Sequence, residues 1–481
     1  MSSPFLDSQL AAFDAQAPRL PGARLGWLAE SRRANRDALA AGGLPGPRVE
    51  GWKYSPLRAL ERRAFVASDA AAMAPALPPG AWTLAGVEGS RLVFVDGLLD
   101  RAQSRFVAEE GVSLLGLAEA MDSGSDGLCH ALGERYAAAD DGFARLGAAL
   151  AADGAVLRIA PGVQVRQMVQ CVFVSRAGPA DLAWHARLVV ALGVGARARV
   201  IEHHLDAGTH ANFGNLLTRV TLEAGAELDW LRISGEPEAA TAIARTEVEL
   251  GAGARYSATA IEAGAALSRH ELRIRLAGAG ARCESRGVFA LRGRRHADIA
   301  LTIEHAARDT TSLVHWRGVA DDRARGAFGG TIHVAVGADG ADAALTNKNL
   351  LLSPHAEIAT RPVLEIDADE VKASHGATVG RLEEGALFYL RSRGIPEVEA
   401  RALLTFAFCR EMLDGIAEPA LREAVAERLR QLLPQRESLP LDGAEPAPDL
   451  IRGAGVGEPG TRQGDLSPAF RARHDDDGDD R

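Results

Sequence analysis

The stretch Leu192-Gly193-Val194-Gly195-Ala196-Arg197-Ala198 contains a short pattern that recurs through the middle of the chain. In this pattern a glycine is followed by a small residue, a variable residue and usually a larger apolar residue. The first glycines of successive copies are 33, 30, 28 and 27 residues apart. The five copies are Gly162-Val163-Gln164-Val165, Gly195-Ala196-Arg197-Ala198, Gly225-Ala226-Glu227-Leu228, Gly253-Ala254-Arg255-Tyr256 and Gly280-Ala281-Arg282-Cys283.

A self-similar period of this length is typical of a solenoid, in which stacked coils bury one another's faces. Glycine suits the corners because it adopts backbone angles that a side chain penalises. Alternation of apolar and polar residues begins near residue 155 and continues for more than two hundred residues, as in Thr246-Glu247-Val248-Glu249-Leu250. The alternative is an antiparallel sandwich with glycine-rich hairpins. Five matched corners favour a β-solenoid.

Helical patterns flank the strand region on both sides. Residues 1 to about 45 predict helices, and further helical patches lie at 114–121 and 143–152. Between them, Arg91 to Leu99 predicts a strand, an Asp96-Gly97 turn and a returning strand. After residue 380 we expect one helix from Glu383 to Arg393 that ends at Gly394, a second beginning at Pro396 with the apolar stripe Val398, Ala402, Phe406, Leu413 and Ile416, and a third from Pro419 to Leu433.

These patterns divide the chain into four parts. The expected parts are a helical or mixed N-terminal region (1–150), the strand core (151–380), a C-terminal helical domain (381–433) and an acidic, disordered tail (434–481).

The composition excludes several classes of function. The chain has 481 residues and a formal charge of -10, so no basic face for nucleic acid or an acidic membrane is expected. No run of eighteen apolar residues occurs and the N-terminus lacks the pattern of a signal peptide, which predicts a cytoplasmic protein. The four cysteines are far apart with no CxxC motif, which predicts reduced thiols and no compact zinc site.

The lysines exclude a nucleotide-binding P-loop. That motif needs lysine directly after glycine, and the three lysines follow Trp52, Asn347 and Val371. If ATP is used, another subunit must hydrolyse it.

Histidines are the next candidates for chemistry. Alternation along a strand places Glu202 and His204 on one face and His203 on the other. Glu202 and His204 are therefore weak candidates for metal ligands, and a structural role is favoured. His270, His296, His305, His315 and His333 are each expected to be ordinary polar or core residues.

The segment Ser374-His375-Gly376-Ala377-Thr378-Val379-Gly380 lies where the strands give way to helices. Small neighbours leave room for a second chain, and neutral imidazole binds metals well. His375 is thus the main ligand candidate, with Ser374, Gly376, Thr378 and Gly380 as an interface motif. The alternative is a histidine that is hydrogen-bonded within a turn.

This part of the sequence resembles the SufD branch of the SufB/SufD family of iron-sulfur cluster assembly proteins. The resemblance covers about residues 50 to 430, is weaker at Trp52-Lys53-Tyr54 and around Asp141 to Ala149, and leaves the acidic tail outside. The residues that carry it are Asn347, Asn349 to Ser353, Ala356, Arg361-Pro362, Leu364 to Ile366, Asp369, Val371-Lys372, Ser374 to Gly380, Phe388 to Ile395 and Ala400-Arg401.

The resemblance implies a right-handed parallel β-helix between helical N-terminal and C-terminal parts. It also implies a non-enzymatic scaffold that pairs with SufB through the β-helices and recruits the ABC-type ATPase SufC through its C-terminal helices. His375 would then face a SufB cysteine and assist binding of iron or a nascent iron-sulfur cluster, transient and shared with SufB. No nucleotide is expected on this chain, and a role for flavin stays open.

Three residues depart from the family pattern. Ala373 stands where many members have cysteine, Leu345 where glutamine is common, and Gly147 where asparagine is. The chain has four cysteines, and they are too far apart in the sequence for this chain alone to hold a cluster, which usually needs four thiolates.

Two other functions are weighed against the scaffold with a ligand histidine. In the first, the chain is a purely structural adaptor between SufB and the ATPase, with no metal ligand. In the second, it is a polysaccharide-active solenoid enzyme, which the lack of an export signal and an aromatic content of 5% disfavour.

Overall fold

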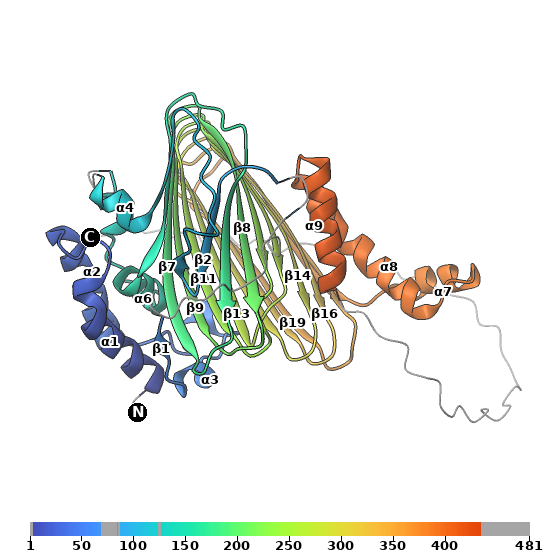
Figure 1. The fold of residues 1–481 in the computed structure, drawn as a ribbon. Helices are drawn as coiled ribbons and strands as arrows, with labels where there is room; N and C mark the ends of the chain where they lie inside the picture. The colour runs from blue at the N-terminus through green and yellow to red at the C-terminus, as the bar shows by residue number, and fades with distance from the viewer. Residues whose placement is uncertain (1–2, 69–83, 85–86, 124–126, 434–481) are drawn as a thin grey trace, which may run out of the picture. The chain divides into compact units, whose positions relative to one another are not determined.

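Two parallel sheets form the centre of the molecule (Figure 1). The computed structural model describes residues 3–68, 84, 87–123 and 127–433. The expected disordered tail, 434–481, lies outside the described residues. In the described part of the chain no helix is long and apolar enough to cross a membrane.

Each sheet has ten strands, named here sheet A and sheet B. Sheet A contains β1 (Val66–Ala67), β4 (Val112–Gly116), β5 (Asp153–Ile159), β7 (Leu182–Leu192), β9 (Phe213–Leu222), β11 (Thr241–Leu250), β13 (Leu267–Leu276), β15 (His296–His305), β17 (Arg325–Val334) and β19 (Glu357–Ile366). Sheet B contains β2 (Arg91–Val95), β3 (Leu98–Leu99), β6 (Val169–Arg176), β8 (Arg197–Ala207), β10 (Glu227–Ser234), β12 (Arg255–Glu262), β14 (Arg282–Leu291), β16 (Thr311–Ala320), β18 (Ala341–Leu351) and β20 (Val371–Gly380).

The connectivity is that of a β-solenoid. From β5 to β20 successive strands alternate between the sheets, and each strand pairs in parallel with the strand two places along the chain. In sheet B, for example, Trp230 of β10 lies between Val200 of β8 and Ala258 of β12. These sixteen strands make about eight coils. The predicted solenoid is confirmed, and the sandwich is wrong because consecutive strands from β5 to β20 lie in different sheets and form no hairpins.

The predicted corners are confirmed by their backbone angles. Gly162, Gly195, Gly225, Gly253 and Gly280 all have φ between 64° and 75°. The amide of Gly195 donates to the carbonyl of Ala224 (2.8 Å), one coil further along, and that of Gly225 to Ala252 (2.8 Å). Asp309, with φ 58°, takes the same position in a later coil, because Asp tolerates the left-handed region better than most residues.

The residue after the corner glycine explains the second position of the repeat. Ala196, Ala226, Ala254 and Ala281 are fully buried and belong to the apolar interior between the sheets. A methyl group fits there because the two sheets converge at the corner.

The N-terminal region covers the outer face of sheet A (Figure 1). Its helices are α1 (Pro4–Gln16), α2 (Gly26–Gly42), α3 (Arg58–Glu61), α4 (Leu117–Asp122), α5 (Cys129–Leu132) and α6 (Gly142–Leu150), with short 3-10 turns at Ala17–Arg19 and Glu50–Trp52. Phe5, Phe143 and Phe213 form an aromatic cluster at this contact. The predicted Asp96-Gly97 turn is confirmed, with φ 47° and 80°.

One prediction for this region is wrong in part. The expected helix over 114–121 begins only at Leu117, because residues 112–116 form β4 and pair antiparallel with β5. In β4 the backbone N–H and C=O groups bond to β5 and not along a helix. A helical pattern within one segment does not reveal such a distant partner.

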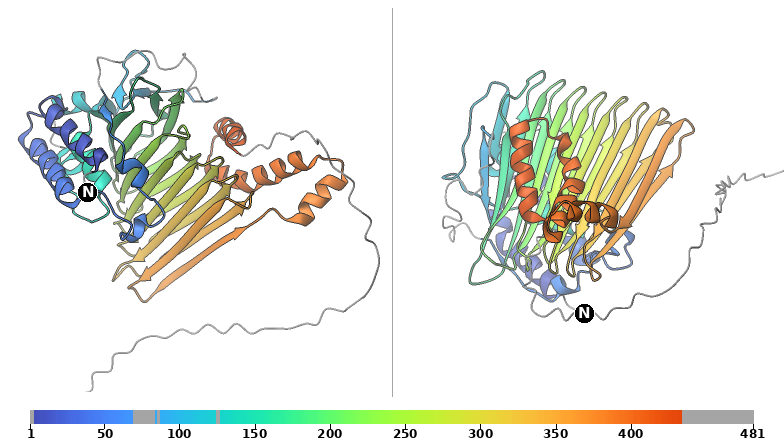
Figure 2. Two further views of the ribbon diagram at one scale, coloured as in Figure 1. Left: turned by 90° about the horizontal axis from the view of Figure 1, so that it is seen from below. Right: turned by 90° about the vertical axis from the view of Figure 1, so that its right-hand side faces the viewer.

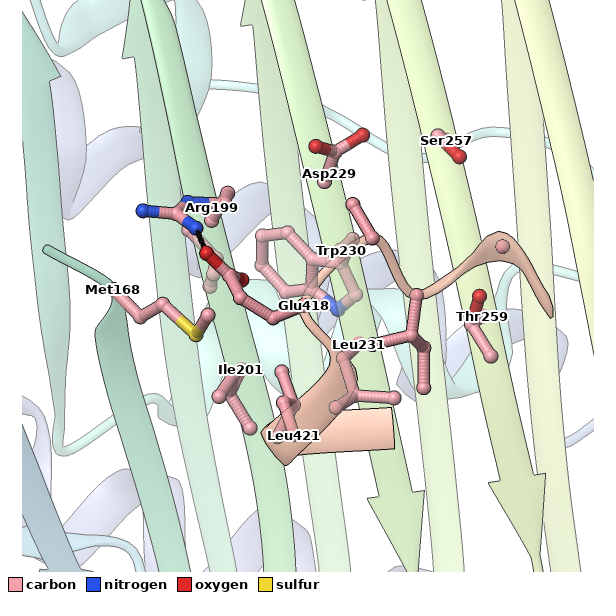
Figure 3. A pocket seen from close by; sticks show the side chains of 14 residues that line it. Met168, Arg199, Ile201, Asp229, Trp230, Leu231, Ser257, Thr259, Glu418 and Leu421 are labelled. Carbon is pink, nitrogen blue, oxygen red and sulfur yellow. Dashed lines mark hydrogen bonds and ion pairs between the residues drawn. The ribbon is translucent and has the colours of Figure 1, made fainter. Parts of the chain in front are cut away.

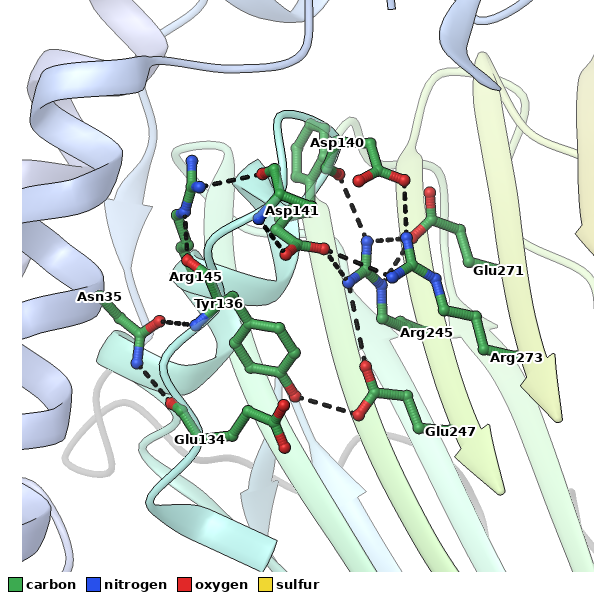
Figure 4. Close-up of polar contacts among 12 residues, drawn as sticks. Asn35, Glu134, Tyr136, Asp140, Asp141, Arg145, Arg245, Glu247, Glu271 and Arg273 are labelled. Atoms are coloured by element: carbon green, nitrogen blue, oxygen red, sulfur yellow. Dashed lines mark hydrogen bonds and ion pairs between the residues drawn. The ribbon is translucent and has the colours of Figure 1, made fainter. Parts of the chain in front are cut away.

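A buried ionic network fastens the N-terminal region to sheet A (Figure 4). Arg245 of β11 contacts Asp141 and Glu271, both at 2.6 Å, and Arg273 contacts Asp140 at 2.7 Å. Burial alone raises the pKa of the Glu271 carboxyl, but Arg245 and Arg269 outweigh burial and hold that pKa at about 2.

The C-terminal helices follow β20 and are α7 (Glu384–Ser392), α8 (Glu397–Arg410) and α9 (Pro419–Leu432), with a 3-10 turn at Glu411–Gly415 before α9. Helix α9, the end of α8 and the turn between them cover the outer face of sheet B (Figure 2). Leu421 of α9 approaches Ile201 and Leu231, while Arg199 forms an ion pair with Glu418 (Figure 3). The cavity left at this contact is about 50 Å³, which is too small for an organic ligand.

The three predicted C-terminal helices are confirmed with small corrections. Gly394 ends the first with φ 86°. Pro396 was expected to be the first residue of the second helix. It is the N-cap residue instead, and α8 begins at Glu397. The residues of the predicted apolar stripe do not share one environment. Leu413 and Ile416 are buried against sheet B, whereas Val398 is 39% exposed.

The corner glycines predict a specific cost of substitution. Gly253→Ala should lower the free energy of unfolding by about 1–2 kcal/mol, because alanine at φ 64° strains the backbone although nothing blocks the methyl group. Urea unfolding monitored by circular dichroism measures this.

Gly46→Ala is the matched control, since Gly46 also has open space but no left-handed φ. It should be neutral or stabilising, and Gly253→Asn should cost less than Gly253→Ala. Equal effects of Gly253→Ala and Gly46→Ala would contradict the corner argument.

The Glu271 network predicts a dependence on acid. Because the folded pKa lies below the unfolded value of about 4.3, this stabilisation is complete above about pH 4.5 and is lost as the pH falls toward 2. Glu271→Gln should destabilise the protein at pH 7 and flatten the fall in stability between pH 4.5 and 3. Unfolding by urea across this range tests it, with Glu304→Gln, whose side chain is 36% exposed, as control. An unchanged slope in Glu271→Gln would refute the assignment.

Candidate functional site

The solenoid ends in an unpaired edge. β19 and β20 are the last strands of sheets A and B, and among the described residues no strand pairs with their outer edges. An exposed edge presents unsatisfied N–H and C=O groups that can pair with another chain. Pro362 lies within β19 and has no N–H, whereas β20 has no proline, so β20 is the better surface for continued pairing.

His375 lies in the middle of this last strand. It is in register with Leu345 of β18, whose side chain belongs to the apolar interior, so His375 is on the strand face that continues the interior. His375 is exposed because no further coil covers it. Its ring has no hydrogen bond or ion pair with another described residue, so the hydrogen-bonded turn alternative is not supported.

The small neighbours of His375 are also exposed. Ser374, Gly376, Thr378 and Gly380 lie on the opposite face of β20. A methyl group added at Gly376 or Gly380 would meet nothing within 4 Å. A second backbone can therefore approach β20 closely, as the interface motif requires.

A buried amide layer lies beneath the last coil. Asn349 donates to Asn347 (2.6 Å) and to the carbonyl of Thr378 (3.0 Å), and Thr360 donates to Asn347 (2.8 Å). The Asn349 Oδ1 atom is buried without a hydrogen-bond partner in the described residues. Sequence reasoning assigned no role to these residues, although both asparagines are among those that carry the family resemblance.

Ala373 shares the His375 face of β20. Residues two apart on a strand point to the same side, about 7 Å apart. A cysteine at this position would have brought a thiol next to the imidazole, whereas the methyl group of Ala373 packs against the apolar interior.

Glu202 and His204 form a separate cluster deep inside the solenoid. His204 Nε2 is 2.6 Å from Glu202 Oε1, and Arg232 contacts Glu202 and, at 2.8 Å, Glu262. The Arg232 guanidinium already supplies the positive charge beside Glu202 that a bound metal cation would otherwise supply. Six strand steps separate β8 from β20, about 29 Å at ~4.8 Å a step, so one metal ion cannot join His204 and His375.

The remaining histidines follow the expectation in outline. His203 lies on the outer face near Arg428, opposite Glu202 and His204. His305 is held by Thr310 and Ser312, both at 2.8 Å, and His315 by Thr346 at 2.7 Å. The rings of His305 and His315 are therefore ordinary structural polar groups.

The cysteines do not join His375. Cys171 and Cys283 lie in the solenoid interior, and Cys409 lies between the C-terminal helices and sheet B. Burial raises the pKa of the Cys171 and Cys409 thiols to about 12 and also raises that of Cys283, so these three remain protonated. In the described part of the chain no group of three His, Cys, Asp or Glu side chains is placed to hold a metal ion.

A second exposed surface lies on α7 and α8, away from the apolar contact with sheet B. Phe388 is 73% exposed and Tyr389 58%, and Val398 and Leu403 are also exposed. Exposed large apolar side chains on neighbouring helices make this surface a candidate for contact with another protein.

Comparison with known proteins identifies the family. The chain is 31% identical over 395 residues to the iron-sulfur cluster assembly protein SufD of Escherichia coli, which covers 82% of this chain and 90% of the relative. The chain belongs to the SufBD family. A model described as SufBD protein N-terminal region matches residues 9–171, and one described as SUF system FeS cluster assembly, SufBD core domain, matches residues 173–408.

Two further members of the SufBD family show the same similarity. An iron-sulfur cluster assembly SufBD family protein of Synechocystis is 29% identical over 439 residues, 89% of this chain and 94% of the relative. SufD of Bacillus subtilis is 29% identical over 276 residues, 56% of this chain and 62% of the relative. The chain is therefore a SufBD protein of iron-sulfur cluster assembly.

Proposed function

We propose that this SufBD protein is a non-catalytic scaffold subunit on which iron or a nascent iron-sulfur cluster is held by His375 together with thiolates of a partner. The observation that supports it is the exposed, unpartnered imidazole at the centre of an unpaired terminal strand. The cluster is cargo in this proposal, because this chain offers one ligand and a cluster usually needs four.

The proposed partner is SufB, bound edge to edge at β20. A related solenoid that adds its own strand to β20 would satisfy the N–H and C=O groups of the edge. The partner would also cover the interior face of the last coil, where His375 and the partly buried Val371 and Ala373 lie. His375 would then be enclosed between two chains, with a partner thiolate opposite.

The proposed source of energy is a separate ATPase, SufC, bound at α7 and α8. This chain has no P-loop lysine, and the exposed Phe388 and Tyr389 offer an apolar docking surface. ATP-dependent movement of SufC would act through these helices, which join the solenoid directly after β20. A cytoplasmic location follows from this partnership, because ATP is available there.

A second candidate function is a purely structural adaptor, in which His375 is no ligand. Ala373 favours it, because the thiol that many relatives carry beside this histidine is missing here. The following experiment separates the two functions.

His375→Ala should leave the complex with SufB and SufC intact but reduce its iron and acid-labile sulfide at least several-fold. His375 makes no hydrogen bond within the described chain, so its removal should not unfold the protein. Co-purification, followed by iron and sulfide analysis and absorption spectroscopy of the reconstituted complex, measures both effects.

His355→Ala is the control, because His355 is exposed at the corner that leads into β19 of the same last coil. It should load clusters normally. An intact complex with normal loading in His375→Ala would rule out the ligand role and leave the adaptor.

Phe388→Asp should weaken SufC binding at least about tenfold, because burying a phenyl ring contributes about 1.5–3 kcal/mol and a buried charge opposes it. Val336→Asp replaces an apolar residue that is 83% exposed at a solenoid corner and should have no effect. Binding of SufC to each purified variant is measured by titration calorimetry. Unchanged affinity for Phe388→Asp would exclude the α7 surface as the docking site.

A further inference from the structure

A cavity of about 440 Å³ lies on the outer face of sheet A, away from β20. Helix α3 forms one side of it and the first residues of β11, β13, β15 and β17 form the other. Its volume is in the range of cavities that bind small molecules, about 300–1,000 Å³. The proposed scaffold function makes no use of it.

The ionisable residues that line this cavity are all basic. They are Arg63, Arg294, His296, Arg323 and Arg325, and no Asp or Glu side chain is among the lining residues. The solenoid places them together. The amide of Arg323 donates to the carbonyl of Gly293 (3.0 Å), and His296 of β15 is in register with Arg325 of β17, so two corners are stacked about 4.8 Å apart.

The positive charge of this cavity is only partly compensated. Arg63 pairs with Asp181 at 2.7 Å. Arg325 pairs with Glu357 at 3.4 Å, and the side chains of Arg325 and Glu357 are each more than 60% exposed. No hydrogen bond or ion pair joins the guanidinium of Arg294 or Arg323 to another described residue.

Two acids at these corners accept hydrogen bonds from backbone amides. Glu238 accepts from the backbone amide of Arg294 and Asp322 from that of Gly293, both at 2.9 Å. They hold the corner backbone and do not pair with the guanidinium groups of Arg294 and Arg323.

His296 adds an imidazole to the basic side chains that line the cavity. Its side chain lines the cavity, the residue is 9% exposed, and its ring has no hydrogen bond to another described residue. Neither ring nitrogen is among the buried polar atoms that lack a partner, so the imidazole is open to a molecule in the cavity. The apolar lining includes Pro56 and Leu60 on the α3 side and Leu267 at the start of β13.

We propose that this cavity binds a small organic phosphate, with the phosphate group against Arg294, Arg323, Arg325 and His296 and the apolar part against Leu60 and Leu267. Guanidinium groups match phosphate oxygens in pairs of hydrogen bonds, which favours phosphate here. The volume of about 440 Å³ suits a small molecule better than a nucleic-acid backbone.

Titration calorimetry of the full-length protein with phenyl phosphate and with inorganic phosphate tests this proposal. Phenyl phosphate should bind saturably and at least tenfold more tightly than inorganic phosphate. Arg294→Gln combined with Arg323→Gln should weaken phenyl phosphate binding at least tenfold. The control is Arg275→Gln with Arg308→Gln, two arginines whose side chains are 57% and 62% exposed outside the cavity, and it should bind normally.

Three results would overturn the proposal. They are no saturable binding of phenyl phosphate to the wild type, equal affinity for the two phosphates, or the same loss in the control variant as in the cavity variant. Circular dichroism and urea unfolding of both double variants confirm that each is folded. Because SufC binding and cluster loading are measured separately, failure here leaves the scaffold function unaffected.

Discussion

The parallel ladder between successive coils is the interaction on which the rest of the structure depends. Each strand finds its partners two strands away, so a coil is stable only when the coils beside it are in register. The corner bonds, such as Gly195 N–H to Ala224 C=O, hold that register at the point where the chain changes sheet. A left-handed residue there lets the chain turn, and the alanine after it keeps the interior closed.

The stack of coils has two ends, and the candidate surfaces lie where other elements leave it uncovered. Along sheet A, N-terminal helices cover the outer face, and the Arg245 network fastens them to β11 and β13. At the last coil, β20 leaves its edge and the His375 face open. The C-terminal helices begin directly after this edge, so α7 and α8 present Phe388 and Tyr389 on the chain segment that follows His375. The same stacking brings Arg294 and Arg323 together, though they are 29 residues apart in sequence.

Much of this architecture could be predicted from local patterns. The glycine repeat predicted the coils, and the change of period near residue 380 predicted the C-terminal helices, because both patterns reflect backbone requirements within a few residues. The helix expected at 114–121 was wrong in part because β4 pairs with β5, a contact that no local pattern encodes. The exposure of Val398 was likewise missed, since the same helical stripe contacts sheet B only at its later residues.

The sequence by itself determined the solenoid and the missing P-loop and made His375 the ligand candidate, since each depends on residue identity and spacing along the chain. Only the tertiary structure decided which side chains meet across coils. It showed that Arg232 pairs with Glu202 beside His204, that Asn347 and Asn349 form a layer beneath the last coil, and that Arg294, His296 and Arg323 share one cavity. The physical reason is that neighbours in a solenoid are one coil apart, about 27 to 33 residues along the chain, and their register is set by the ladder as a whole.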